Sequence, residues 1–278
     1  MAKKSPERTP PESLNLPRVG VETHAHLDSR EFSGDLEEVL ERAAASGIAA
    51  MGQVFLGPSA YQANRDLFVD RPEVFFLLGV HPNDADELSD AALADMAEAF
   101  ASDDRLKALG EVGLDFYWKR VSPETQERAL REQLVLARER GLRVVVHSRD
   151  AFAETLAVLD DMGFRDRPVL WHCFGGDEAM AREILSRGWL ASIPGPVTYP
   201  KNTELAQAVA AMDMDRLVVE TDCPYLTPEP WRGKRNEPAL AVFTAARVAQ
   251  LKGLTVEEAW RRMGKTAAGF FGLDLPEG

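Results

Sequence analysis

The fold of this chain is decided by RVVVHSRDAFAETLAVLDDMGFRDRPVLWHCF, residues 143–174. Two short apolar runs, RVVVHS (143–148) and PVLWHCF (168–174), flank an amphipathic helical pattern over about 150–162. A continuous apolar run is typical of a parallel strand that is buried on both faces, whereas alternation is typical of a half-exposed strand. The stretch therefore predicts a strand–helix–strand unit in which a histidine stands near the end of each strand.

The same alternation continues along the chain from Val19 onward. Six further apolar runs predict strands over 20–27, 48–55, 74–82, 106–115, 189–195 and 216–222. Helical patterns occupy about 34–47, 58–70, 89–102, 122–141, 176–187, 202–213, 237–252 and 255–271. Eight strands with a helix after nearly every one predict an α/β fold, a single (β/α)₈ TIM barrel. A doubly wound open sheet is the alternative, but it would gather ligands at one switch point, whereas here they come from six strands.

The chain is expected to contain one large domain. Residues 1–18 are dominated by proline, charge and serine, which predicts a flexible N-terminal extension, and residues 19–274 form the predicted barrel domain. The N-terminal residues contain no apolar stretch before their prolines, so we do not expect a secretory signal. No run of 18 or more apolar residues predicts a membrane-spanning helix.

The composition is that of an ordinary globular protein with an acidic balance, at a formal net charge of −13. Such a charge works against sequence-independent attraction to DNA or to an anionic membrane, but it leaves room for nucleic acid at a site with its own metal ions. Only Cys173 and Cys223 are present, so no disulfide framework is expected and a cytoplasmic setting fits. Each cysteine follows a candidate ligand and is either a small buried residue or, if the strand bulges, a thiolate ligand.

Polar side chains capable of holding a metal stand at the ends of the predicted strands. They are His24, His26, His81, His147, His172, Glu111 and Asp222. The carboxyl ends of barrel strands surround one mouth, so we expect these side chains to lie together there. His24 and His26 are two residues apart and point to the same face of their strand. Mixed imidazole and carboxylate ligands suit zinc, manganese or related divalent ions, with magnesium also possible.

The ligand types favour two divalent metal ions and hydrolysis. Glu111 has two oxygens and can bridge two ions, while His147 and His172 can complete the second one. Asp222 can both hold a metal and accept a proton from a bound water. Two ions roughly 3.5–4 Å apart would clamp the attacking and leaving oxygens of a displacement.

Seven motifs in order resemble the TatD-type metal-dependent deoxyribonucleases of the amidohydrolase superfamily. They are THAHLD (23–28), GVHP (79–82), GEVGLDFYW (110–118), VVHSRDA (145–151), HCFGG (172–176), VETDCPYL (219–226) and RGKRNEPA (232–239). The resemblance covers residues 20 to about 272. It implies that one ion is held by His24, His26, Glu111 and Asp222, and the other by Glu111, His147 and His172.

The resemblance also implies a reaction, the hydrolysis of DNA phosphodiester bonds by trimming from a 3′ end. Asp222 would orient or deprotonate the attacking water, with Glu111 between the ions, and His81 would lie near the scissile phosphate. Two departures from the family pattern stand out. Glu22 occupies a position where the family more often has aspartate, and it is either a partner of a metal ligand or a buried structural carboxylate. The N-terminal extension matches nothing in the family.

The phosphates of such a substrate need local positive charge. Arg149 and the loop residues Arg232, Lys234 and Arg235 follow predicted strand ends, so we expect them to bind the substrate. Rival readings are a hydrolase of a small ester, lactone or amide, a hydrolase of an aminoacyl-RNA ester, and a non-enzymatic scaffold. Hydrolases of cyclic amides commonly use a carboxylated lysine as a metal ligand, and no predicted strand of this chain ends in a lysine. A non-enzymatic scaffold would be expected to lack at least one metal ligand, and none is missing here. No obligate protein partner is indicated.

Overall fold

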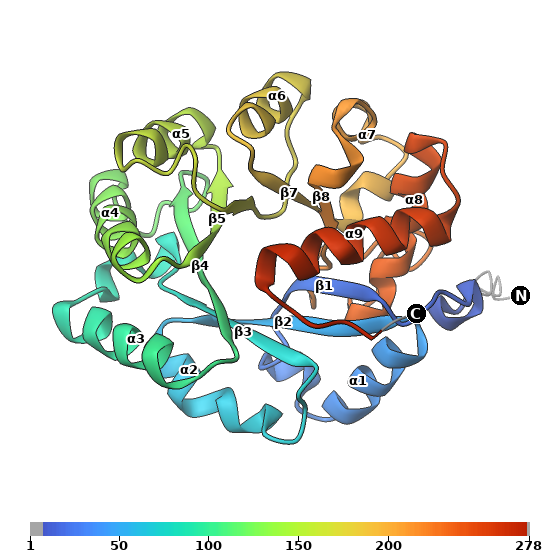
Figure 1. The fold of residues 1–278 in the computed structure, drawn as a ribbon, viewed down its shortest axis with the longest axis horizontal. Coiled ribbons are helices and arrows are strands. Elements are labelled where there is room, and N and C mark those ends of the chain that lie inside the picture. The colour runs from blue at the N-terminus through green and yellow to red at the C-terminus, as the bar shows by residue number, and fades with distance from the viewer. Residues whose placement is uncertain (1–7, 277–278) are drawn as a thin grey trace, which may run out of the picture.

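Eight parallel strands form a nearly closed barrel in this computed structural model, which describes residues 8–276 (Figure 1). The strands are β1 (Gly20–Ala25), β2 (Ile48–Leu56), β3 (Val74–Gly79), β4 (Leu106–Asp115), β5 (Arg143–Arg149), β6 (Val169–Trp171), β7 (Leu190–Ile193) and β8 (Leu217–Val219). They pair in chain order from β1 to β8, each parallel to the next. The predicted (β/α)₈ barrel is confirmed, and the doubly wound alternative is excluded.

Helices surround the barrel at the positions that the sequence predicts. They are α1 (Leu36–Ala45), α2 (Pro58–Asn64), α3 (Asp90–Ser102), α4 (Pro123–Arg140), α5 (Phe152–Asp161), α6 (Glu178–Ser186), α7 (Thr203–Ala211), α8 (Ala241–Lys252) and α9 (Val256–Phe271). Helix α4 shows why such segments are helical. The Ser122 hydroxyl accepts a hydrogen bond from the Thr125 amide at its start, and Gly141 ends it with a φ of 65°.

The barrel closes between β1 and β8 through a few bonds rather than a long ladder. Ala25 and Cys223 form an isolated parallel bridge, and the Asp222 amide donates to the His24 carbonyl at 3.0 Å. The buried Glu22 carboxylate accepts from the amides of His24 at 2.9 Å and Thr221 at 3.0 Å. Glu22 therefore joins the two closing strands and holds the backbone of a predicted ligand, which combines the two roles considered for it.

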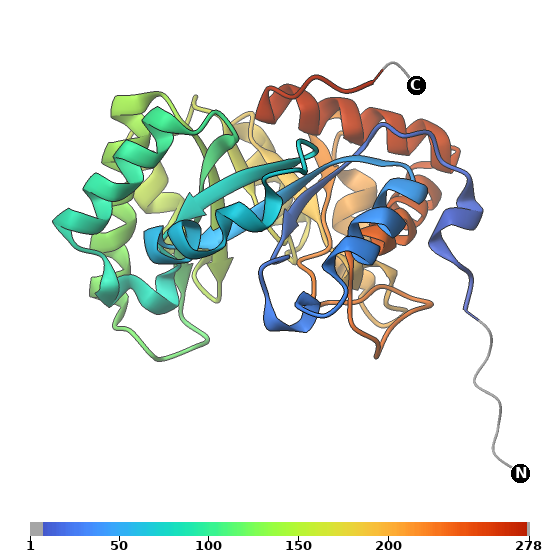
Figure 2. The ribbon, with the colours of Figure 1, turned by 90° about the horizontal axis from the view of Figure 1, so that it is seen from below.

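The barrel interior has two layers of different chemistry. The layer near the amino ends of the strands is apolar and packs against α9, which covers this end of the barrel (Figure 2). It contains Val145, Leu170, Leu190 and Val218 together with Phe270 and Phe271. Two residues further along the same strands stand His147, His172, Ser192 and Glu220. Because side chains two apart share a strand face, a polar layer lies above the apolar one, toward the mouth.

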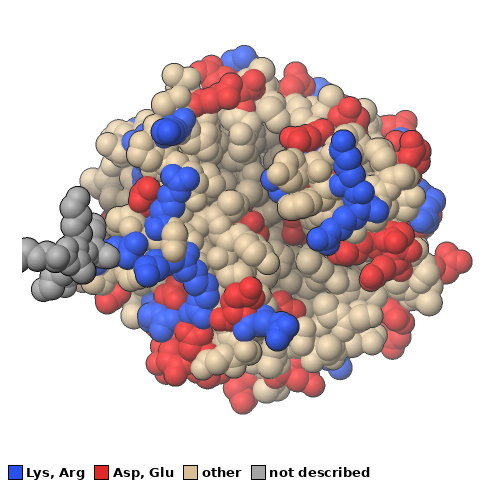
Figure 3. Space-filling model, turned by 180° about the vertical axis from the view of Figure 1, so that it is seen from behind, with Lys and Arg blue, Asp and Glu red and all other residues tan. Residues whose placement is uncertain are grey.

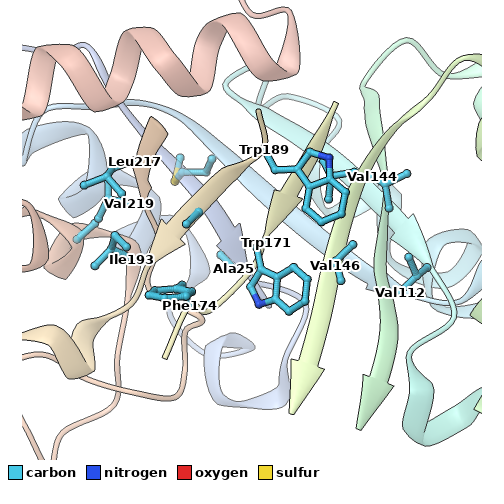
Figure 4. Close-up of a cluster of buried hydrophobic side chains, with 14 of the residues drawn as sticks. Ala25, Val112, Val144, Val146, Trp171, Phe174, Trp189, Ile193, Leu217 and Val219 are labelled. Carbon is cyan, nitrogen blue, oxygen red and sulfur yellow. The ribbon is translucent and has the colours of Figure 1, made fainter. Parts of the chain in front are cut away.

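A second apolar core lies outside the barrel, between the strands and the helices. Figure 4 shows part of it, where Val146, Trp171, Ile193 and Val219 follow one another across neighbouring strands. Each of these residues is one position away from an inward-facing residue of its strand. Both faces of the strands are thus buried, as their continuous apolar sequences predict.

The described part of the N-terminal extension lies against the barrel. Residues 11–14 form the 3₁₀ helix η1 (Pro11–Leu14), in which Pro11 is buried. The Pro17 carbonyl accepts a hydrogen bond from the Trp260 indole at 3.0 Å, and the Thr9 carbonyl accepts one from the Trp231 indole at 2.9 Å. Residues 8–18 thus contact the barrel instead of forming a free arm, because prolines stiffen the segment and indole donors bind its carbonyls. Residues 1–7 of the predicted extension lie outside the described residues.

Within residues 8–276, no single helix is long and apolar enough to cross a membrane. Only residues Pro238–Lys252 and α9 taken together reach the necessary length and composition, and they are bent by 109° relative to each other. Most of the apolar residues of these two helices are buried in the fold.

Candidate metal centre

The seven predicted strand-end residues all lie at the carboxyl mouth of the barrel. This face is hollowed at its centre, and acidic side chains are visible inside the hollow (Figure 3). His24 lies on β1, Glu111 on β4 and His147 on β5. His26 and His172 directly follow their strands, while His81 and Asp222 lie two and three residues beyond the ends of β3 and β8. The sequence therefore placed these residues correctly in the fold, and their side chains converge.

Glu111 is the centre of this cluster. Its Oε2 atom lies 3.2 Å from His24 Nε2, and its Oε1 atom lies 2.7 Å from His147 Nδ1 and 3.4 Å from His172 Nε2. The carboxylate is almost inaccessible to solvent, with 5% of its side chain exposed. The two oxygens thus face two different groups of histidines, which is the arrangement that a bridging carboxylate needs.

Asp222 lies on the His26 side of the cluster. Its Oδ1 atom is 3.4 Å from His26 Nε2 and 4.0 Å from His24 Nε2. Three-residue groups whose ligand atoms all lie within 4.8 Å of one another include His24, His26 and Glu111; His24, His172 and Asp222; and Glu111, His147 and His172. These overlapping groups contain all six predicted metal ligands.

The charge balance of the centre fits a cation. Glu111 and Asp222 are buried or nearly so, and neither pairs with a lysine or arginine of the described residues. Burial alone would lower the pKa of His172, but the carboxylates of Glu220 and Glu111 raise it to about 10. His24 Nδ1 and Glu220 Oε1 are buried without a hydrogen-bond partner. Among the described residues only histidines lie close enough to balance these buried carboxylates, and divalent ions on the same nitrogen and oxygen donors would neutralise them without protonating the rings.

His81 differs from the other histidines in its surroundings. Its Nε2 atom lies 3.6 Å from Glu111 Oε1, and its Nδ1 atom accepts a hydrogen bond from the Asn83 amide at 3.1 Å. Burial lowers the pKa of His81 to about 4, so the ring is neutral at pH 7. Because Nδ1 accepts, Nε2 carries the proton and points toward the centre as a donor.

Two carboxylates of the centre were not assigned roles from the sequence. Asp115 Oδ2 lies 3.2 Å from His147 Nε2, and Glu220 Oε2 lies 2.9 Å from His172 Nδ1. Each holds the ring of a predicted ligand from the side away from Glu111, and such contacts fix the orientation of a metal-binding histidine. A signal was present, since Asp115 and Glu220 stand at even spacings from Glu111 and Asp222 on their strands.

The two cysteines differ in their burial and in their surroundings. Cys223 is buried, and Cys173 lies with His172 and Glu220 in a group that could also hold a metal. The distortion that a thiolate ligand needs is present at Cys173, whose φ is 49°. However, burial and the nearby Glu220 carboxylate raise the pKa of the Cys173 thiol well above its usual value. Without a bound ion, this favours a neutral, partly buried thiol at Cys173.

The basic residues of the mouth fall into two kinds. Lys and Arg side chains gather on both sides of the hollow (Figure 3). The guanidinium of Arg149 lies 3.8 Å from the Tyr117 ring centre and that of Arg232 lies 4.0 Å from the Tyr199 ring centre. These two and Lys234 have no acidic partner among residues 8–276. Arg235 instead donates to both carboxylate oxygens of Asp35, at 2.8 and 2.7 Å.

Comparisons with known proteins agree with this geometry. The family described as TatD related DNase matches residues 21–272. The metal-dependent hydrolase YabD of Bacillus subtilis (strain 168) is 35% identical over 237 residues, 85% of this chain and 92% of that protein. A protein of Cronobacter sakazakii named 3′-5′ ssDNA/RNA exonuclease TatD is 37% identical over 82% of this chain and 88% of its own length.

A solved structure shows the same fold over almost its whole length. The TatD homologue YjjV of Escherichia coli K12 matches with a TM-score of 0.86 and 26% identity, covering 92% of this chain and 99% of its own. The family match spans all the residues that converge at the mouth. The chain therefore belongs to the TatD family of metal-dependent hydrolases.

Proposed function

We propose that this protein is a deoxyribonuclease that hydrolyses phosphodiester bonds in DNA with two divalent metal ions and trims strands from their 3′ ends. The observation that carries the proposal is the position of Glu111, with one oxygen beside His24 and the other beside His147 and His172. The exonuclease name of the Cronobacter relative supports the substrate class.

The proposed ligand sets use each of the six residues. His24, His26, Glu111 and Asp222 would hold one ion, and Glu111, His147 and His172 would hold the other. When bound, such ions lower the pKa of a water and neutralise charge on the phosphate, and zinc, manganese and magnesium all suit the donors. Asp115 and Glu220 keep the His147 and His172 rings in position through their outward nitrogens.

Asp222 is the residue that we assign to proton transfer. It lies beside His26 with 17% of its side chain exposed, so it can receive a proton from a water at the open side of the centre. The other carboxylate ligand, Glu111, is more deeply buried, with 5% of its side chain exposed, and both of its oxygens face histidines. General-base assistance of this kind contributes about 10²–10⁴-fold to a rate.

His81 and the basic rim would bind the phosphates. The neutral His81 ring can donate from Nε2 to an oxygen of the scissile phosphate, next to the Glu111 oxygen that it now faces. Arg149, Arg232 and Lys234 retain their charge for other phosphates, whereas Arg235 holds the loop through Asp35. The substrate role predicted for Arg235 is therefore replaced by one of fixing the loop that carries Arg232 and Lys234.

A hydrolase of a small ester, lactone or amide, or of an aminoacyl-RNA ester, is the second candidate. The ions alone do not distinguish these substrates, since any of them presents an oxygen to polarise. The free cations around the mouth favour a polyanion over a neutral ring. Both cysteines are free thiols, so the cytoplasm is the compartment that we propose.

A screen of substrates with measured metal content tests the proposal. Protein loaded with manganese or magnesium should shorten single-stranded DNA one nucleotide at a time, and a chelator should stop the reaction. RNA, a small ester, a lactone and a cyclic amide are assayed with the same sample. Loaded protein that leaves DNA intact but opens the amide or lactone would overturn the nuclease assignment in favour of the second candidate.

A further inference from the structure

A groove lies between the N-terminal segment and the loop that follows β8. It encloses about 500 Å³, and its walls include Arg8, Pro10 and Pro11 on one side and Trp231, Lys234 and Leu240 on the other. The N-terminal wall lies outside residues 21–272, the part of the chain that matches the family. This feature therefore belongs to the present chain and is not explained by the metal centre.

Specific bonds hold the N-terminal segment against the loop. The Trp231 indole donates to the Thr9 carbonyl at 2.9 Å, and the Arg8 guanidinium donates through Nε to the Pro230 carbonyl at 3.0 Å. Arg8 also lies over the Trp231 ring, 5.8 Å from its centre. These two hydrogen bonds and the cation–π contact, made by the consecutive residues Arg8 and Thr9, hold Arg8 in one position beside the loop.

The same loop is tied directly to the metal centre. It leaves the barrel at Asp222, and its base is closed by the buried Asn236, whose side chain donates to the Thr221 and Tyr225 carbonyls. The Asn236 amide also donates to the Pro224 carbonyl at 3.1 Å. Trp231 thus projects from a short closed loop that begins at a predicted metal ligand.

The charges that line the groove are unequal. Four cations (Arg8, Arg42, Lys234 and Arg235) face two carboxylates (Glu12 and Glu237). Arg42 is paired with Glu237 at 2.7 Å, and Arg235 is paired with Asp35. Arg8 and Lys234 have no acidic partner among the described residues. Two unpaired cations beside an aromatic ring form a suitable site for a phosphate next to an unpaired base.

We propose that this groove binds a phosphate of a single-stranded nucleic acid outside the metal centre, with Arg8 and Lys234 as its cations and Trp231 between them. This inference rests on the proposed nuclease function. The N-terminal segment is then part of the substrate-binding surface, and Arg8 adds a contact that the family-matching residues do not supply. An acidic protein of net charge −13 gains from concentrating positive charge along one path to its active site.

Salt-dependent binding tests this proposal. A fluorescently labelled twelve-nucleotide single strand with phosphorothioate linkages is titrated with the manganese-loaded protein at several salt concentrations. The wild type is compared with Arg8→Gln/Lys234→Gln. Each lost phosphate contact lowers the slope of log Kd against log salt by about 0.7 for a single strand, so the double variant, which loses the one phosphate of the groove, should lose about 0.7 and bind more weakly.

A charge-matched control separates local from global effects. Lys107→Gln/Lys265→Gln removes the same charge at the amino end of the barrel, where Lys107 lies near the start of β4 and Lys265 lies on α9. Its slope should equal that of the wild type. Equal slopes for the two double variants would overturn the groove proposal alone, while a wild type that binds no nucleic acid would overturn the proposed function as well.

Discussion

The two ends of the barrel interior are built from the same strands but have opposite chemistry. At the amino end, Leu170 and Val218 pack with Phe271 of α9. Two residues further along each strand, His172 and Glu220 carry buried polar groups, and Glu220 Oε1 has no hydrogen-bond partner. Apolar burial stabilises the fold, whereas buried polar atoms cost free energy unless something compensates them. The amino end thus serves stability and the mouth serves chemistry.

The largest effect on turnover should come from the replacement of one carboxylate oxygen by nitrogen at the mouth. Asp222→Asn keeps the shape of the side chain and tolerates the φ of 55°, but its amide cannot accept the proton of a water. We expect turnover to fall about 10²–10⁴-fold while much of the metal is retained. Turnover and metal content of the same purified sample measure both quantities.

Asp150→Asn is a matched control for this variant. Asp150 is also an aspartate with a positive φ, 53°, at the carboxyl end of a strand, but it is exposed and is not part of the cluster. Its turnover should stay within about twofold of the wild type, since surface changes of this kind have small effects. Near-normal turnover in Asp222→Asn would remove Asp222 from proton transfer.

A cavity at the amino end of the barrel should lower the stability of the protein and leave its turnover unchanged. Phe271 is completely buried, and its ring centre is 4.7 Å from that of Phe75. Phe271→Ala should lower the free energy of unfolding by about 3–5 kcal/mol, and Phe271→Leu by less, because a smaller void remains. Denaturant titration measures the loss. Turnover per folded molecule should be unchanged, and a large fall in it would show that the two ends are not independent.

A variant of His81 tests whether this residue binds the phosphate or a metal ion. His81→Asn keeps an oxygen that can accept from the Asn83 amide and removes the Nε2 donor near Glu111. If His81 contacts the phosphate, turnover should fall about 10²–10³-fold with an unchanged number of bound ions. The metal content of the variant distinguishes the two roles, because the loss of one bound ion would show that His81 is a metal ligand.

The smallest effect is expected for an ion pair outside the barrel, between Asp160 and Arg187, which contributes to stability. Asp160 accepts two hydrogen bonds from Arg187, at 2.9 and 2.6 Å, and this partner lowers its pKa. A depressed pKa in the folded state stabilises the protein above the unfolded value of about 3.9, and the contribution is lost as pH falls through the folded pKa. Asp160→Asn should therefore cost about 1 kcal/mol at pH 7 and less at about pH 3, which is below the unfolded pKa of about 3.9. Thermal unfolding at both pH values would contradict this if the two losses were equal.

The sequence predicted the fold well because each strand is apolar on both faces. All eight strands were located, and β4 was predicted with the correct bounds, 106–115. The largest differences are at the strand ends, and β3 ends at Gly79, three residues earlier than predicted. Strands β6 and β8 also end three residues early, at Trp171 and Val219. Near these ends Cys173 and Asp222 have positive φ values, so the strands stop where the chain turns its polar side chains into the mouth.

The candidate site was predicted less completely than the fold. The histidines, Glu111 and Asp222 were visible because polar residues at the ends of apolar strands are unusual. Asp115 and Glu220 were overlooked although they stand at even spacings from Glu111 and Asp222, because the spacing does not show which histidine nitrogen faces each of them. The ion pair of Arg235 with Asp35 joins residues 200 positions apart, so it became visible only in three dimensions.

The most direct test of two-ion catalysis at this mouth is a metal titration. Manganese is added in known equivalents to metal-free protein, and the trimming of a 5′-labelled single-stranded DNA is followed at each step. The arrangement around Glu111 predicts that turnover rises mainly with the second equivalent and that products shorten from the 3′ end. Full turnover at one equivalent, or intact DNA at two, would contradict the account.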